Sequence, residues 1–417
     1  MPIPSRNRGV GSRKGILAYA LAYNLPMKTT PPTAQNAAPA TLPSNRTLLG
    51  GRTPAAFLKQ FWHKDALLTR NAVPGFNGLF TRAELFAFGE RDDVESRLLV
   101  RDGARWTFAN GPFKRSDWKA LPERNWTLLV QGVNLLSDAA DALMRRFSFV
   151  PFARLDDLMV SYAAPGGGVG PHFDSYDVFL LQGEGQRRWK YGRQDDLTLR
   201  PGLPLRILKK FVPERDDVVG PGDLLYLPPQ SAHDGVAVTA CQTYSVGFRA
   251  ATANEFAAGF LDFLRDEVDL PGRYADPDLA PTTTPARIGP AMQRQCAKIL
   301  AGIRWDTARI ARFLGCWLSE PKPHVFFEPP ERPVALPRFQ AAIAKGGVRL
   351  DRRSTLLYDD RHLYINGSAL NWPPQDATML ARLADQRALS ASEAAALTPE
   401  TAALLHQWYR DGFARSG

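Results

Sequence analysis

The sequence predicts an α+β protein in which antiparallel strands form a sandwich or barrel, followed by a helical region and a small mixed domain. Three observations lead to this fold class. Residues 157–250 consist of short β-type runs separated by Gly and Pro. Residues 253–318 place apolar side chains at helical spacing, and a Pro-rich joint at 328–333 precedes the last segment. A chain of 417 residues has room for two to three such domains.

The first 52 residues are predicted to be a disordered basic tail. They contain seven Lys and Arg and no acidic residue, so the net charge of +10 falls to +3 (10 − 7) without them. Because the folded part carries so little excess charge, the basic pI is weak evidence for a nucleic-acid-binding surface. The apolar stretch 15–23 fits a signal or transit peptide, but it is short and contains tyrosines. The alternative is that the true start is Met27.

Order is predicted to begin near Thr53, where Thr-Pro precedes an apolar run that ends at Trp62 and places proline in the first helical turn. A helix over 82–89 and a strand over 126–131 follow. The β-rich segment is predicted to contain strands at 158–162, 178–182, 188–191, 224–227 and 243–248.

The chain turns helical again at residue 253. Residues 253–268 carry Phe256, Phe260, Phe263 and Leu264 on one face, and 281–318 hold a second pair of helical stretches. Such faces usually pack in a core, and an oligomerisation surface is the functional alternative. In the terminal domain, strands are predicted at 348–350, 355–358 and 363–365, and helices at 374–384 and 391–413.

Composition indicates a chain that works in a reducing compartment. Cys241, Cys296 and Cys316 are widely separated and form neither a zinc-like nor a disulfide-like spacing. No run of about eighteen apolar residues occurs, so no transmembrane helix is expected. We therefore predict a cytoplasmic protein without a membrane partner.

The candidate site begins in the glycine-rich segment 165–174, which ends in His172-Phe-Asp174. Residues two apart on a strand project from the same face, so an imidazole and a carboxylate would be presented together. His233, which follows a strand and a Pro-Pro corner, supplies a third donor. Two histidines and one carboxylate leave three open positions, as non-haem iron(II) oxygenases require for a chelating co-substrate and oxygen.

Each of these residues has a simpler interpretation when taken alone. An isolated His-x-Asp has roughly one chance in ten of being a metal site. The same donor set also occurs in catalytic zinc sites, although no His-Glu-x-x-His helix is present here. We expect structural roles for the remaining four histidines, which are His63, His324, His362 and His406.

Arg187 favours an oxygenase over other metal sites. It lies fifteen residues after His172, on the strand that follows a hairpin turn. A guanidinium offers a two-pronged contact to the distal carboxylate of 2-oxoglutarate. Ser161, on the strand before the glycine-rich loop, would add a hydroxyl donor to the same carboxylate, although a strand serine is more often structural.

Longer motifs resemble the bacterial ribosomal oxygenases of the JmjC/cupin superfamily. They are Asp156-Asp-Leu-Met-Val-Ser-Tyr, the run from Pro165 through His172-Phe-Asp174 to Gly183, Arg187-Arg-Trp, Pro221-Gly-Asp-Leu-Leu-Tyr-Leu-Pro-Pro and Tyr244-Ser-Val-Gly-Phe-Arg249. The resemblance covers about residue 54 to the C-terminus. The N-terminal extension has no counterpart in the family, and two segments depart from its pattern: Gln230-Ser-Ala-His-Asp-Gly and Cys241-Gln-Thr. These departures leave the metal ligands intact and concern substrate contacts.

The resemblance implies a double-stranded β-helix (jelly-roll, cupin) core. It implies a JmjC oxygenase domain at 53–251, a helical dimerisation region at 252–327 and a winged-helix-like domain at 334–417. His172, Asp174 and His233 match the family's iron(II) ligands, and Arg187 matches its 2-oxoglutarate arginine. A winged-helix-like fold does not by itself indicate DNA binding, and none is expected.

The implied activity is hydroxylation of an arginyl residue in a large-subunit ribosomal protein, protein sixteen. It would use iron(II), 2-oxoglutarate and O2, and the enzyme would be a homodimer. Two alternatives stay open. One is a JmjC-type hydroxylase with another substrate, and the other is a catalytically silent metal-binding interaction protein.

Overall fold

Two antiparallel sheets form the first half of the described chain. The structure is a computed structural model that describes residues 45–103, 105–202 and 205–417. The larger sheet has eight strands in the order β1-β9-β6-β11-β5-β4-β2-β3, and every neighbouring pair is antiparallel. Its strands are β1 (Leu67–Thr69), β2 (Ser96–Asp102), β3 (Arg105–Asn110), β4 (Trp126–Val130), β5 (Leu155–Ala163), β6 (Val178–Gln182), β9 (Leu224–Leu227) and β11 (Cys241–Phe248).

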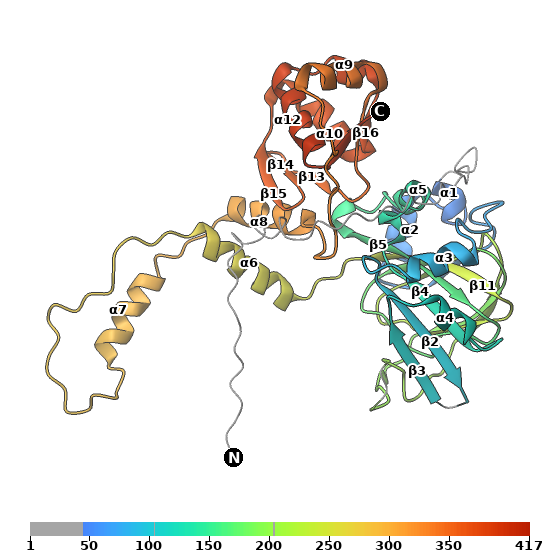
Figure 1. Cartoon of the computed structure of the whole chain (residues 1–417). Coiled ribbons are helices and arrows are strands. Elements are labelled where there is room, and N and C mark those ends of the chain that lie inside the picture. The colour runs from blue at the N-terminus through green and yellow to red at the C-terminus, as the bar shows by residue number, and fades with distance from the viewer. Residues whose placement is uncertain (1–44, 104, 203–204) are drawn as a thin grey trace. The chain divides into compact units, whose positions relative to one another are not determined.

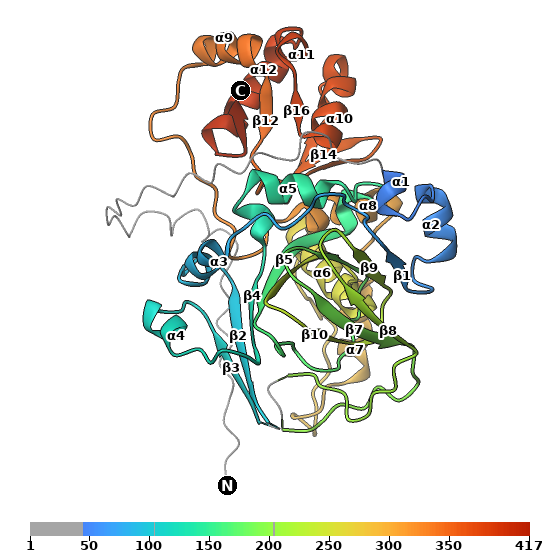
Figure 2. The same cartoon turned by 90° about the vertical axis from the view of Figure 1, so that its right-hand side faces the viewer.

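The smaller sheet closes over one face of the larger one. Its order is β10-β7-β8, with β7 (Arg187–Gly192), β8 (Arg215–Val219) and β10 (Ala232–Ala237). An apolar cluster joins the two sheets, in which Leu180 and Leu225 of the large sheet pack with Trp189 and Tyr191 of the small one. Figure 2 shows β7, β8 and β10 beside the large sheet. This pair of sheets is the jelly-roll predicted from the sequence.

Helices cover the opposite face of the large sheet. Phe57, Leu85 and Leu143 of these helices belong to one buried cluster with Val160 and Tyr244 of the strands. The first-half helices are α1 (Asn45–Leu48), α2 (Pro54–Gln60), α3 (Arg82–Gly89), α4 (Arg115–Lys119), α5 (Asp138–Arg145) and the 3-10 turns η2 (Val133–Leu135) and η3 (Phe152–Arg154).

The start of the folded core differs from the prediction. Leu48 and Leu49 are fully buried in the helix-covered core, although both fall within the tail predicted at 1–52. Their apolar side chains pack there because the basic residues around them can remain at the surface. The boundary at Thr53 is therefore too late. The stretch 15–23 and Met27 lie outside the described residues.

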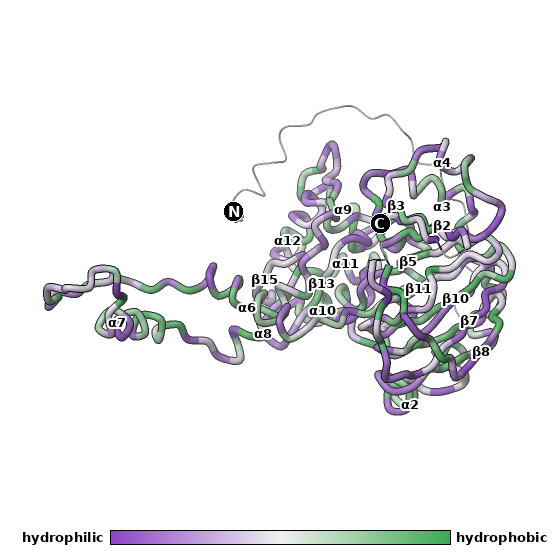
Figure 3. The backbone as a smooth tube through the Cα atoms, turned by 90° about the horizontal axis from the view of Figure 1, so that it is seen from below, coloured by the Kyte–Doolittle hydropathy of each residue, from purple (hydrophilic) through white to green (hydrophobic). Residues whose placement is uncertain are grey.

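Three helices follow the sheets, α6 (Ala253–Glu267), α7 (Pro290–Leu300) and α8 (Thr307–Ser319) (Figure 1). Phe260 of α6 packs against Phe313 of α8, with ring centroids 5.3 Å apart. In contrast, α7 has no buried residue, and Figure 3 shows both hydrophobic and hydrophilic segments along it. None of the helices in the described part of the chain is long and apolar enough to cross a membrane.

The terminal segment has its own core around Phe339, Leu380 and Trp408. It contains α9 (Leu336–Gly346), β12 (Val348–Leu350), β13 (Leu356–Tyr358), β14 (His362–Ile365), β15 (Ser368–Asn371), η4 (Pro374–Asp376), α10 (Ala377–Gln386), β16 (Ala388–Leu389), α11 (Ala391–Ala395), α12 (Pro399–Arg410) and β17 (Ala414–Ser416). The single helix predicted over 391–413 is wrong. Thr398 adopts an extended conformation before Pro399 and caps α12, which separates it from α11.

Candidate metal centre

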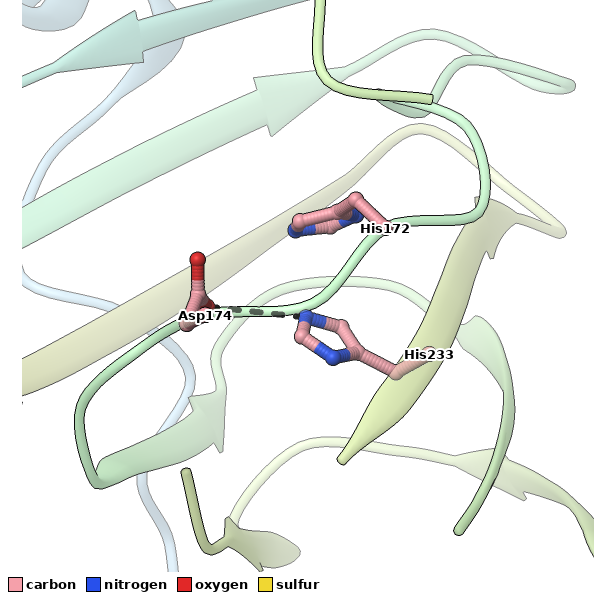
Figure 4. A group of neighbouring side chains, drawn as sticks. All are labelled: His172, Asp174 and His233. Atoms are coloured by element: carbon pink, nitrogen blue, oxygen red, sulfur yellow. Dashed lines mark ion pairs between the residues drawn. The ribbon is translucent and has the colours of Figure 1, made fainter. Parts of the chain in front are cut away.

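His172, Asp174 and His233 converge in the structure. Each offers one donor atom, and these atoms all lie within 4.8 Å of one another (Figure 4). Nε2 of His233 is 3.7 Å from Oδ2 of Asp174, and the two imidazole centroids are 4.2 Å apart. Within the described ranges, this is the one group of three His, Cys, Asp or Glu residues close enough to hold a metal ion.

The local structure that brings these residues together differs from the prediction. His172 and Asp174 lie in the loop between β5 and β6, not on a strand. His172 instead forms an isolated antiparallel bridge with His233, in which N–H of each residue donates to the carbonyl of the other at 2.9 and 2.8 Å. Such a directly opposed pair brings two side chains to the same face. The backbone N–H of Gln230 then donates to the carbonyl of Asp174 at 2.7 Å.

Both imidazoles are held in the same tautomer by the same local contact. Nδ1 of His172 lies 2.8 Å from the carbonyl of Gly170, and Nδ1 of His233 lies 2.9 Å from the carbonyl of Ser231. A carbonyl only accepts hydrogen bonds, so each Nδ1 must carry the proton. Each Nε2 therefore keeps its lone pair for a metal ion, and the carbonyls act as the outer partners that orient ligand histidines.

The electrostatic setting keeps His233 neutral. Its side chain is almost completely buried, and burial together with the nearby His172 lowers its pKa to about 4. A neutral imidazole is the form that binds a metal. His233 is therefore in its metal-binding form at neutral pH.

Arg187 is buried in the space between the two sheets. It is 4% exposed, its Nη2 donates to Oγ of Ser161 at 3.3 Å, and its guanidinium lies over the ring of Trp189. Its Nε has no hydrogen-bond partner, and no ion pair of Arg187 occurs within the described chain. A buried charge ordinarily has a charged partner. This side chain is therefore suited to bind an anion that enters from outside the chain.

The prediction singled out Ser161 but missed the polar residues beside it. Ser161 of β5 lies opposite Thr243 of β11, which in turn lies opposite Gln182 of β6. All three are at most 4% exposed, and the hydroxyl of Thr243 donates to Oε1 of Gln182 at 3.0 Å. Polar residues at alternate positions of otherwise apolar strands were the available signal. Ser161, Thr243 and Gln182 therefore make one part of the interior polar, beside the apolar cluster that joins the two sheets.

The residues that follow Asp174 have separate roles. Tyr176 is exposed, whereas Asp177 is fully buried and accepts a hydrogen bond from the hydroxyl of Tyr226. Asp177 therefore cannot contact a substrate. Among the other histidines, His63 pairs with Asp177 at 2.9 Å, and Nε2 of His406 lies 2.8 Å from the carbonyl of Val334.

Comparison with known families gives two matches. A JmjC domain model matches residues 142–256, and a ROXA-like winged helix model matches residues 302–415. The first range includes the three converging residues and Arg187. The second begins before the winged-helix-like domain predicted at 334–417 and takes in α8.

The chain is similar to proteins that are known as ribosomal oxygenases. It is 34% identical over 344 residues to the ribosomal protein uL16 3-hydroxylase of Escherichia coli, covering 80% of this chain and 89% of that protein. It is 36% identical over 235 residues to a probable ribosomal oxygenase of Haemophilus influenzae, covering 54% of this chain and 58% of that protein.

Solved structures of the E. coli protein YcfD have the same fold. One has a TM-score of 0.76 at 32% identity and covers 87% of this chain and 98% of the other. Another is of YcfD, a ribosomal oxygenase, in complex with cobalt and 2-oxoglutarate. It has a TM-score of 0.73 at 31% identity and covers 87% of this chain and 97% of that one.

Proposed function

This chain belongs to the JmjC ribosomal oxygenases, and from that premise we propose that it is an iron(II)- and 2-oxoglutarate-dependent protein hydroxylase. Its substrate would be an arginyl residue of the large-subunit ribosomal protein uL16, in the cytoplasm. The observation that carries the proposal is the convergence of His172, Asp174 and His233 beside a buried, unpaired Arg187.

The donor set fits the proposed metal. Two imidazoles and one carboxylate would hold a divalent cation and leave positions for a chelating co-substrate and O2. Iron(II) bound there supplies the oxidising chemistry: 2-oxoglutarate is converted to succinate and carbon dioxide, and one oxygen atom enters a C–H bond of the substrate. The protein's own task is to orient these partners.

Arg187 and Ser161 fit the co-substrate. The guanidinium would bind the distal carboxylate of 2-oxoglutarate, and the hydroxyl of Ser161 would donate to the same group. Binding would also complete the hydrogen bonds of Arg187, whose Nε is otherwise unsatisfied. A structure of YcfD in complex with cobalt and 2-oxoglutarate supports 2-oxoglutarate as the co-substrate.

Asp157 and Tyr176 support a cationic target. Asp157 of β5 is partly buried and accepts a hydrogen bond from the backbone N–H of Gly132 at 3.2 Å. Gly247 has no side chain, which leaves space beside Asp157 and Tyr176. A Cβ at this position would lie 3.6 Å from Oδ1 of Asp157 and 3.8 Å from Cε2 of Tyr176. Burial raises the pKa of Asp157 to about 6, so it is mainly ionised at neutral pH and can bind a guanidinium.

Mass spectrometry of ribosomal proteins from cells with and without the gene tests the proposal. We expect one oxygen atom more, about 16 mass units, on one arginyl residue of uL16 only when the gene is present. Unmodified ribosomal proteins together with 2-oxoglutarate turnover by the purified chain would indicate a hydroxylase with another substrate. No turnover in the presence of iron(II) would indicate a catalytically silent metal-binding protein.

A further inference from the structure

The loop that carries Asp174 needs an anchor on each side. Upstream, the bridge between His172 and His233 and the hydrogen bond from Gln230 fix its backbone. Downstream, Ser175 and Tyr176 are exposed, and Asp177 is the first buried side chain before β6 begins at Val178. Asp177 therefore occupies the position from which the far end of the loop can be fixed.

Three separate segments contact the carboxylate of Asp177. The hydroxyl of Tyr226 on β9 donates to Oδ1 at 2.6 Å, and Nε2 of His63 lies 2.9 Å from Oδ2. Nη2 of Arg154 lies 3.7 Å from the same oxygen. The backbone carbonyl of Asp177 also accepts a hydrogen bond from Phe248 at 3.1 Å. The carboxylate is 0% exposed, so it persists there because of these partners.

The turn after α2 is shaped to reach this carboxylate. His63 has a φ of 58°, in the left-handed region that residues other than glycine rarely adopt. Its backbone N–H donates to the hydroxyl of Tyr226 at 3.0 Å while its ring faces Asp177. The two contacts form a closed set of interactions among His63, Asp177 and Tyr226. Backbone strain held by surrounding contacts is often found beside functional sites.

We propose that His63, Asp177 and Tyr226 form a positioning cluster that fixes the Asp174 carboxylate and so sets the affinity of the metal site. None of the three touches the metal donors, and they act through the backbone between Asp174 and Val178. This inference rests on the proposed metal site. It adds residues from two segments, the α2–β1 turn and β9, to those that determine metal binding.

Tyr226→Phe is the direct test, and Tyr244→Phe is its matched control. Both tyrosines are fully buried on the helix-covered face of the large sheet. The hydroxyl of Tyr244 also accepts hydrogen bonds from backbone N–H groups of the N-terminal half, from Leu79 at 2.6 Å and from Phe80 at 3.2 Å. Each substitution therefore removes a buried hydroxyl and its hydrogen bonds. Only the hydroxyl of Tyr226 contacts Asp177, in the loop that carries Asp174.

Titration of the metal-free full chain with cobalt(II), followed by visible absorption, gives both the affinity and the coordination geometry. We expect Tyr226→Phe to weaken cobalt binding by about tenfold and to change the absorption bands, as outer-shell substitutions do. Tyr244→Phe should bind within about twofold of wild type while losing a similar amount of thermal stability.

Three further variants keep the proposal falsifiable if Tyr226→Phe folds poorly. His63→Ala changes a half-exposed side chain and should weaken cobalt binding by roughly threefold. Asp177→Asn keeps an acceptor for Tyr226 and should bind more tightly than Asp177→Ala. Unchanged affinity in these variants, or equal losses in Tyr226→Phe and Tyr244→Phe, overturns the positioning role. A wild-type chain that binds no cobalt contradicts the proposed function itself.

Discussion

Arg187 is the residue whose surroundings most clearly call for a ligand. A guanidinium at 4% exposure without a carboxylate partner loses its hydration and recovers little of it from one serine hydroxyl and one indole face. A hydrogen bond to a charged group contributes about 1.5–3 kcal/mol. Arg187 would therefore contribute the largest share of the binding free energy of an incoming carboxylate. Arg188, one residue later, faces away and pairs with Asp216 at 2.8 Å.

Replacing Arg187 should therefore impair co-substrate binding. We expect Arg187→Lys to raise the KM for 2-oxoglutarate by roughly 10-fold to 100-fold, because an ammonium cannot make the two-pronged contact. Ser161→Ala should raise it by only about threefold to tenfold, since a neutral hydrogen bond is lost. Steady-state kinetics with varied 2-oxoglutarate measures both effects. Arg188→Ala is the control, and an equal change in that variant would refute the assignment.

The pKa of His233 predicts how the metal-free chain responds to acid. Its folded pKa of about 4 lies below the unfolded value of about 6.5, so the unfolded chain takes up a proton first as pH falls. The free energy of unfolding should therefore decrease between pH 6.5 and pH 4, and a His233→Gln variant should lack this contribution. Urea unfolding of both metal-free proteins across this range is the measurement. Identical slopes would contradict the prediction.

At the scale of elements, the sequence was sufficient where one pattern dominated. The strands β6 and β9 and the helix α3 have the predicted bounds, because their apolar residues and flanking turn signals agree. The exposed, polar β8 and the glycine-containing β10 have no such pattern and were missed. The place of Asp174 depends on the bridge between His172 and His233, which are 61 positions apart (233 − 172), and no local pattern encodes it.

Helix α7 supports the proposed dimerisation region. It has no buried residue, and Met292 and Leu300 are 44% and 60% exposed. Leu261 of α6 and Trp305 before α8 are also largely exposed. An apolar surface of this kind is usually covered by another protein surface. We propose that a second copy of the chain covers it.

Charged substitutions on α7 should separate such a dimer. We expect wild type to have twice the chain mass of 46.1 kDa in light scattering, and the Met292→Asp, Ile299→Asp double variant to have the single mass. Val212→Asp changes an apolar residue that is 55% exposed outside this region and should leave the mass unchanged. A single chain mass for wild type would exclude the homodimer.

At the scale of the whole molecule, the terminal domain is joined to the jelly-roll by specific polar contacts. Nε of Arg352 donates to the carbonyl of Leu135 at 2.6 Å, and its Nη1 pairs with Asp138 at 2.9 Å. Lys322, in the segment before this domain, pairs with Asp156 at 2.9 Å. These partners are far apart in the sequence, so family resemblance predicted the domain type but no local signal predicted its attachment. The contacts place the linker beside Asp157, where the target residue is proposed to bind.

We propose that the three converging residues and Arg187 couple 2-oxoglutarate turnover to hydroxylation of uL16. To test this, the purified chain is incubated with iron(II), 2-oxoglutarate, O2 and uL16. Succinate formation and oxygen incorporation into uL16 are then quantified in the same sample. We predict one succinate for each hydroxylated arginyl residue in wild type, and neither product with Asp174→Ala. Hydroxylation that persists in Asp174→Ala, or wild-type hydroxylation without succinate, would contradict the account.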